Sequence, residues 1–208
     1  MLFNKDSNNM QNENLLGYVL IIFIFLIIIK IYYESDIFHL TCIVSTVDGN
    51  KYCVRERKNM NRAADLLAKT TENMKVLVQY LHEKYPENEH VKLLVKNFNP
   101  KKIKETLPTS EYTAYSENKG EKIAFCLNKE NETSDELIEE NTLMFVALHE
   151  LSHLATKSIG HKEEFWRTFK FILEESAAIG IYRPVDYKNS NTEYCGMTIN
   201  DNPIYDYK

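Results

Sequence analysis

The sequence lacks an excess of positive charge. Its 208 residues contain 25 lysines and arginines against 30 aspartates and glutamates, which gives a formal net charge of -5 and a pI of about 5.7. A chain with this balance has no overall positive field that would attract phosphate backbones. The one short basic cluster, Lys101, Lys102 and Lys104, is typical of a solvated surface. Composition therefore disfavours nucleic acid as a partner.

The sequence also lacks a Cys-x-x-Cys pair among its four cysteines. This absence argues against a cysteine zinc knuckle and against a dithiol redox motif. Cys42 and Cys53 flank the turn signal at 47–50, so two hairpin strands could bring them together as a disulfide. Reduced thiols are the commoner state in a cytosolic protein, and we expect that state, with the disulfide as the alternative.

No internal repeat and no low-complexity tract is present after the first 35 residues. The composition, 44% hydrophobic and 26% charged, is ordinary for a folded protein, and the length suits one compact domain with an appendage.

The appendage is an apolar run near the N-terminus. Residues 15–29 carry no charge, and if Lys30 snorkels the run continues to Tyr33, long enough nearly to span roughly 30 Å of hydrocarbon. A cleaved signal peptide is the first alternative, but the residues after the run offer no small-x-small cleavage site. A buried core helix is the second, and it would usually keep a polar face. We predict a tail over 1–14, a single-pass signal anchor over 15–33 and a domain over 36–208.

The orientation of this anchor is not decided by charge. Lys5 on one side is offset by Asp6 and Glu13, while Lys30 lies at the other end of the run. The glycosylation acceptor Asn131-Glu132-Thr133 would be used only if the domain were lumenal.

Hydrophobic periodicity predicts a mixed α+β domain. A β-hairpin is expected over 39–56 around Asp48-Gly49, and a second over 111–128 around Asn118-Lys119-Gly120. Helices are expected from a cap at Asn61 to Pro86, over 90–98, from a capping box at Thr133 and Glu136 to Gly160, and over 162–179. The tyrosine-rich tail after Gly180 is expected to be irregular.

The helix expected to end near Gly160 carries a chemical motif, His149-Glu150-Leu151-Ser152-His153. Histidines at i and i+4 share one helix face about 6 Å apart along the axis, so both imidazoles can bind one zinc ion at roughly 2.0 to 2.1 Å. In this motif the glutamate reaches the water on the metal and acts as general base. Chance occurrence is the alternative, but the helix before the motif is apolar, as a buried active-site helix requires.

The third zinc ligand is expected to be His161. It follows Gly160, whose permissive backbone would let the chain turn back after the helix. A glutamate on the following helix, Glu164, Glu174 or Glu175, is the alternative ligand. The other histidines, His39, His82 and His90, are not expected to bind metal.

The segment HELSHLATKSIGHKEEFW resembles the minimal zinc proteases of the WLM and SprT-like group, whose core is HELxH, a short link, a histidine close to a glycine and a downstream phenylalanine. The resemblance implies a zincin-like fold with a small antiparallel sheet, His149, His153 and His161 as zinc ligands, Glu150 as base and Phe165 as a packing residue. The chain from VDGNKY to CGMTIND also looks like uncharacterised WLM-like proteins of large DNA viruses. The link of seven residues after His153 departs from the best-known members.

The sequence therefore predicts a membrane-anchored zinc metallopeptidase acting on a protein or peptide substrate, in a host or virion membrane if the chain is viral. The strand over 122–127 is expected to be an edge strand that pairs with the extended substrate. Tyr182, Tyr187 and Tyr194 are candidates for oxyanion stabilisation, although packing is the commoner role of a tyrosine. Two other functions stay open: a catalytically idle zinc module tethered to a membrane, and a protease of DNA-bound proteins.

Overall fold

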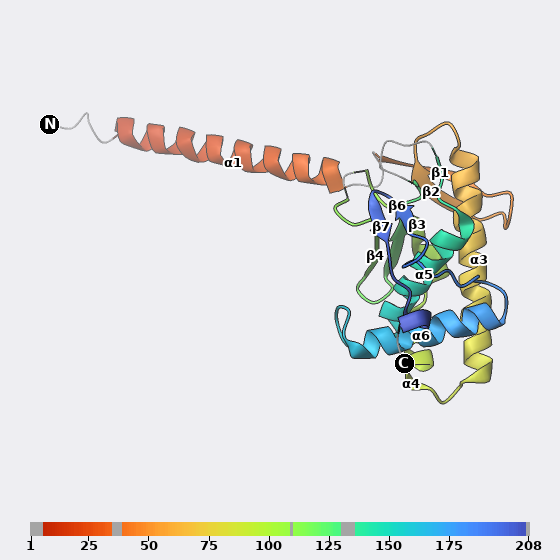
Figure 1. Cartoon of the computed structure of the whole chain (residues 1–208). Coiled ribbons are helices and arrows are strands. Elements are labelled where there is room, and N and C mark those ends of the chain that lie inside the picture. The colour runs from red at the N-terminus through yellow and green to blue at the C-terminus, as the bar shows by residue number, and fades with distance from the viewer. Residues whose placement is uncertain (1–5, 35–38, 109, 130–135, 207–208) are drawn as a thin grey trace. The chain divides into compact units, whose positions relative to one another are not determined.

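The computed structural model describes residues 6–34, 39–108, 110–129 and 136–206 (Figure 1). The chain divides into two compact units, Met1–His39 and Leu40–Lys208. The second unit is a mixed α+β domain with small sheets, in agreement with the predicted class.

Helix α1, Asp6–Glu34, lies in the first unit. Its segment Leu15–Tyr33 has a mean hydropathy of 2.8, and none of the segment is buried. An exposed apolar helix of this length is consistent with a signal sequence or a membrane anchor.

The first hairpin of the second unit forms as predicted. Strands β1, Leu40–Val44, and β2, Lys51–Arg55, pair antiparallel with Cys42 directly opposite Cys53. The two residues form a disulfide, so the expectation of reduced thiols was wrong. The reason is the register, because residues directly opposite in an antiparallel pair bring their Cβ atoms within reach of a covalent bridge.

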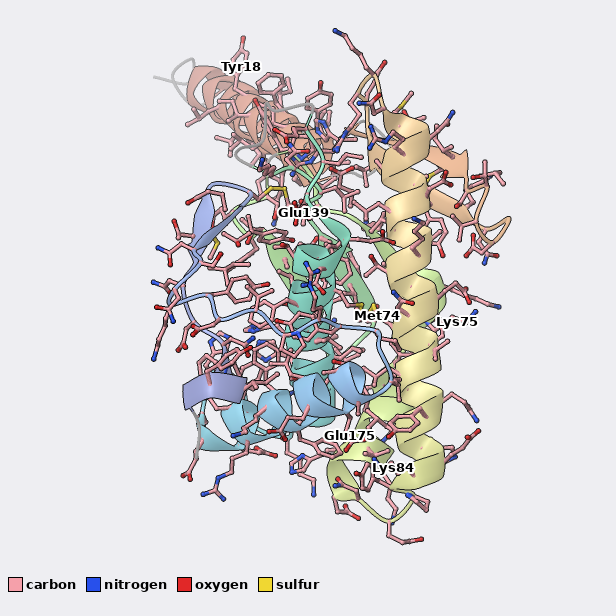
Figure 2. The ribbon with its side chains drawn as sticks, turned by 45° about the vertical axis from the view of Figure 1, so that its right-hand side comes forward. Tyr18, Met74, Lys75, Lys84, Glu139 and Glu175 are labelled. Carbon is pink, nitrogen blue, oxygen red and sulfur yellow. A yellow bond between two sulfur atoms is a disulfide. The ribbon has the colours of Figure 1, made fainter. Side chains whose placement is uncertain are left out.

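Two helices then build one wall of the core. Helix α3, Met60–Lys84, begins one residue before the predicted cap Asn61, and Asn59 is the residue at its N-cap. Figure 2 shows Met74 on its inner face and Lys75 on its outer face, which is the amphipathic pattern that the sequence predicted. Helix α4, Glu89–Asn97, is capped by the Asn88 side chain and leads through the short 3₁₀ helix η1, Pro100–Lys102, into the sheet.

The central sheet has three strands in the order β3-β5-β4. Strand β5, Lys122–Phe125, pairs parallel with β3, Ile103–Glu105, and antiparallel with β4, Ala114–Glu117. The sheet is therefore mixed, not purely antiparallel. The prediction that the strand over 122–127 is an edge strand was wrong, because β5 lies between β3 and β4, which are the two edge strands of the sheet.

Helix α5, Glu140–Ala155, lies at the centre of the domain and contacts α3, α4, α6 and the strands β4 and β5. Twelve of its sixteen residues are buried. It begins later and ends earlier than predicted, since residues 136–139 are not helical and Leu137 forms a β-bridge with Asn128. The predicted capping residue Thr133 and the acceptor Asn131 lie outside the described residues. Helix α6, Glu163–Ala178, follows and crosses below α5 in Figure 1.

The tail after Gly180 is more ordered than predicted. It contains strands β6, Thr192–Tyr194, and β7, Met197–Ile199, which pair antiparallel, and the short helix α7, Pro203–Asp206. A disulfide joins Cys195 to Cys126 at the end of β5, a pairing that the sequence analysis did not anticipate. The expectation of an irregular tail was therefore wrong for these elements, and the tail also adds buried tyrosines to the core.

Candidate metal centre

Helix α5 places two histidines at the edge of an otherwise buried surface. His149 and His153 are half-buried, whereas neighbouring residues of the helix such as Leu148 and Leu151 are fully buried. The four-residue spacing stacks the two imidazoles on one helix face, and their Nε2 atoms are 3.2 Å apart. The local geometry is the one that the i, i+4 spacing predicted.

His161 reaches the same point from the link between α5 and α6. Gly160 has a φ of +76°, a left-handed conformation that residues with a Cβ rarely adopt, and it turns the chain back towards α5. The Nε2 atom of His161 lies 3.0 Å from that of His149. One nitrogen from each of the three histidines thus lies within 4.8 Å of the other two, in a cluster that could hold a metal ion.

The donor set of this cluster fits a metal ion. Four ligands placed tetrahedrally about a metal at about 2.0 to 2.1 Å have neighbouring nitrogens about 3.3 Å apart, close to the two separations observed. Burial, with a smaller contribution from the neighbouring imidazoles, lowers the pKa of His149 to about 3. Burial and the charges of His161 and Lys119 lower that of His153 to about 4. Both rings are therefore neutral at pH 7, as metal ligation requires.

The glutamate of the motif lies beside this cluster without joining it. Glu150 is 5% exposed, lines the same cavity as the histidines and makes a hydrogen bond with the side chain of Ser116 on β4. Burial raises the pKa of Glu150 to about 7, and the hydrogen bond with Ser116 opposes that shift. A carboxyl group whose pKa lies near 7 can both accept and return a proton at neutral pH.

The glutamates considered as alternative ligands lie elsewhere. The Glu164 carboxylate accepts hydrogen bonds from the backbone N–H groups of Lys157 and Ser158. Glu175 accepts from a lysine and two tyrosines at the far end of α6, and Glu174 pairs with Lys170. None of the three belongs to the cluster. His90 is also outside it, because its Nδ1 donates to the Ala155 carbonyl.

Aromatic rings of α6 pack around the three imidazoles. The Phe165 ring is fully buried, and its centroid lies 4.8 Å from that of His149 and 4.7 Å from that of His161. This contact agrees with the packing role that the family resemblance implied for Phe165. Trp166, which the sequence analysis did not single out, lies 5.7 Å from the His161 ring.

An open cavity of about 570 Å³ gives access to the histidines and to Glu150. Its lining includes Ala114, Tyr115 and Ser116 of the edge strand β4 and residues Ser158–His161 of the link. The sequence analysis did not single out the β4 residues, because only the pairing of β3 with β5 removes β5 from the edge of the sheet. The tyrosines named as oxyanion candidates do not line the cavity: Tyr182, Tyr187 and Tyr194 are all buried in the core.

The described structure thus defines an α+β domain with a three-histidine cluster in an open cavity, in a chain with an apolar N-terminal helix. The uncharacterized protein R325 of Acanthamoeba polyphaga mimivirus is 31% identical over 161 residues, which make up 76% of this chain and 81% of that protein. The chain belongs to the same family as this mimivirus protein.

Shorter matches link the chain to iridoviruses. The uncharacterized protein 136R of Invertebrate iridescent virus 6 is 30% identical over 60 residues, and the uncharacterized protein 042R of Invertebrate iridescent virus 3 is 39% identical over 59 residues. These matches cover 29% and 28% of this chain and about a third of each relative, 34% and 36%. No model of a protein family matches the chain. No solved structure matches it either.

Proposed function

We propose that the protein is a membrane-anchored zinc metallopeptidase. The observation that carries the proposal is the convergence of His149, His153 and His161 on one point beside a buried glutamate, in an open cavity bordered by an edge strand. Three histidine ligands with an open fourth position are the ligand set of a catalytic zinc site, whereas structural sites are closed by a fourth protein ligand. Zinc bound there supplies a Lewis acid for the peptide carbonyl and for the attacking water.

In this proposal Glu150 handles the proton. Glu150 follows His149 directly in the chain and lines the cavity. Burial raises the pKa of its carboxyl group to about 7. It therefore accepts the proton of the attacking water and returns it to the leaving amine. The Ser116 side chain on β4 makes a hydrogen bond with the carboxyl group. A zinc module without catalytic activity would have no use for an ionisable group buried at this place.

Strand β4 is the element on which we place the substrate. Cys126 N–H donates to the Thr113 carbonyl, so in the β4–β5 ladder Thr113 and Tyr115 are directed at β5, and the backbone of Ala114 and Ser116 is directed at the outer edge. No described strand pairs with that edge. An extended peptide added there would lie along the wall of the cavity that holds the histidines.

Helix α1 serves in this proposal as a signal anchor. Its apolar segment spans 19 residues, has no buried residue, and is not followed by a small-x-small cleavage site. All four cysteines of the chain are paired in the second unit, which is expected of a domain that matures in an oxidising compartment. The anchor would then place residues after 39 on the lumenal or extracellular side.

The test compares the full-length wild-type chain in detergent with Glu150→Gln, which keeps the shape of the side chain. Zinc content is measured by mass spectrometry, and cleavage of casein and of the chain itself is followed by gel. About one zinc in both proteins, with cleavage by the wild type alone, is the expected result. Glu163→Gln, a neighbouring exposed glutamate that pairs with Arg167, is the matched control and should cleave like the wild type.

Other results would favour other functions. One zinc in both proteins without wild-type cleavage would point to an idle zinc module, and absence of zinc from the wild type would refute the proposal. A protease of DNA-bound proteins would require salt-sensitive DNA binding. The structure lends that function little basis, because Lys104 lies half-buried beside Lys122, apart from the exposed Lys101 and Lys102.

A further inference from the structure

The C-terminal end of the metal-site helix is held by side chains from outside the helix. The last four carbonyl groups of a helix have no partner within the helix. In α5 these belong to Ser152, His153, Leu154 and Ala155, and each accepts a hydrogen bond from a side chain. The donors are Thr156 Oγ1 at 3.1 Å, Lys119 Nζ at 3.1 Å, Asn97 Nδ2 at 2.9 Å and His90 Nδ1 at 2.9 Å, in that order. They come from three segments, helix α4 with His90 and Asn97, the β4–β5 turn with Lys119 and the residue after α5, and together they fix where α5 stops, two residues after His153.

The link that follows α5 is held from both sides. On one side, Lys119 Nζ donates to the carbonyls of Thr156 and Ser158 at 2.8 and 3.1 Å as well as to that of His153. On the other side, the two Glu164 carboxylate oxygens accept from the N–H groups of Lys157 and Ser158 at 3.1 Å each. The carbonyls of the link are thus bound to a cation and its N–H groups to an anion, both charge-assisted interactions.

The turn between β4 and β5 places Lys119 at the C-terminal end of α5. Asn118 and Lys119 have φ angles of +45° and +57°, in the left-handed region, and Gly120 follows with a φ of +103°. A Cβ at Gly120 would lie 2.0 Å from the Asn97 carbonyl oxygen, so only glycine permits the turn to approach the end of α4 so closely. The backbone of the turn therefore adopts conformations that are rare outside glycine. These conformations bring the Lys119 ammonium group to the end of α5.

The rest of the link has little to hold it. Ile159 is 84% exposed, Gly160 is exposed with a left-handed backbone, and the His161 side chain is also exposed. The His161 ring contacts Phe165 and Trp166, but its backbone is positioned by the residues on either side of it in the chain. An unrestrained seven-residue link would have to be ordered whenever a metal binds, at a cost in conformational entropy.

We propose that Lys119 and Glu164 are positioning residues that form a clamp on the link 156–162 and hold His161 within reach of the other two histidines. The clamp deepens the proposed function and rests on the metal site described there. It orders the link before the metal arrives, so binding does not have to order it. Neither residue touches the metal, and both act through His161.

The experiment measures metal affinity in place of activity. Full-length Lys119→Met and Glu164→Gln, each in detergent, are titrated with Zn²⁺ against a chromophoric chelator. Each variant is expected to bind Zn²⁺ about 10-fold or more weakly than the wild type, the size of effect seen when residues behind metal ligands are changed. The absorption spectrum of the Co²⁺-loaded variants should shift as one imidazole is replaced by water, and Lys119→Arg should recover part of the affinity.

Two controls separate the clamp from a general loss of stability. Lys157→Met changes an exposed lysine of the same link, and Glu163→Gln changes the exposed glutamate next to Glu164; both should bind Zn²⁺ as the wild type does. In a His161→Ala background, which weakens binding by itself, Lys119→Met and Glu164→Gln should add less than a twofold further loss, because they act through the missing histidine.

The outcomes distinguish this proposal from the proposed function. A wild type that binds no metal would overturn both. A wild type that binds Zn²⁺ while Lys119→Met and Glu164→Gln bind it equally well would overturn the clamp and leave the metal site standing. Loss of affinity that persists at full size in the His161→Ala background would also overturn the clamp, because the residues would then act on α5 alone.

Discussion

The phenyl ring of Phe165 stacks on the imidazole of His153, with 4.3 Å between the ring centroids and 29° between the ring planes. The same ring contacts His149 and His161 edge-on, at angles of 64° and 81°. One side chain of α6 thus touches all three histidines, two from α5 and one from the link. Because Phe165 is fully buried, it limits the rotamers that the three imidazoles can adopt.

Phe165→Leu is predicted to weaken metal binding more than its effect on stability explains. Leucine keeps the site apolar but loses the flat surface, so the free energy of unfolding should fall by about 1–3 kcal/mol, while Zn²⁺ affinity falls about 10-fold. Urea unfolding of the metal-free protein and a Zn²⁺ titration measure the two effects. Phe169→Leu, whose ring contacts only one of the histidines, is the control. Equal Zn²⁺ affinity in wild type and Phe165→Leu would contradict the prediction.

The histidine pair could be predicted from the sequence because it is local. A four-residue spacing on a helix brings His149 and His153 together whatever the rest of the fold does, and Gly160 marks the turn that returns His161. The hairpins and the helices α3 and α6 could be predicted for the same reason, since their hydrophobic patterns repeat over a few residues.

The walls of the site could not be predicted in this way. Whether β5 is central or an edge strand depends on its parallel pairing with β3, which lies nearly 20 residues earlier in the chain and whose three residues form too short a strand to show a period. The burial of Tyr194 and the bond between Cys126 and Cys195 likewise depend on a contact between segments far apart in the sequence. Ser116 and Lys119 act through such contacts. They belong to no sequence motif, so the sequence alone does not identify them.

The assignment of β4 as the substrate-binding strand predicts the effect of Ala114→Pro. The Ala114 N–H is directed at the outer edge, so proline there removes a donor for substrate without removing a bond to β5. Cleavage of casein should fall at least 10-fold while zinc content stays at that of the wild type. Ala114→Ser, which keeps the N–H, should cleave normally. Full activity of Ala114→Pro would show that substrate does not pair with this edge.

A pH-dependent contribution to stability is predicted at the contact between α3 and α6. Glu175 lies beside Lys84 where the two helices meet (Figure 2), and its carboxylate accepts from Lys84 Nζ, Tyr80 Oη and Tyr85 Oη at 2.7 to 2.9 Å. Burial raises the pKa of Glu175, but the hydrogen bonds from Lys84 and the two tyrosines outweigh burial and leave the pKa below its ordinary value of 4.5.

A lowered pKa means that the folded state binds the Glu175 proton less tightly than the unfolded state does. The stabilisation is therefore complete above about pH 4.5 and is lost as the pH falls through the folded-state value. Glu175→Gln should lower the free energy of unfolding by about 1–2 kcal/mol at pH 7, and the difference from wild type should shrink towards pH 3. Urea unfolding at both pH values measures this. Glu174→Gln is the control, and a difference independent of pH would contradict the prediction.

The two disulfides are predicted to differ in their contribution to stability. They join residues 11 and 69 positions apart, and the loop-entropy relation gives about 3 kcal/mol for Cys42–Cys53 and about 4 kcal/mol for Cys126–Cys195. The longer loop contains both α5 and α6, so its loss should also reduce zinc content. The double variants Cys42→Ala/Cys53→Ala and Cys126→Ala/Cys195→Ala, compared by urea unfolding and zinc analysis, test the order. A larger loss from the first pair would contradict it.

The proposed orientation of the anchor predicts that Asn131 is glycosylated when the full chain is made in eukaryotic cells. Asn131-Glu132-Thr133 is an acceptor sequence, and glycosylation takes place only in the lumen, which is also where disulfides form. A mass shift removed by endoglycosidase and absent from Asn131→Gln is the expected result, together with cysteines that react with maleimide only after reduction. If the chain carries no glycan and its cysteines react without reductant, the domain lies on the cytosolic side.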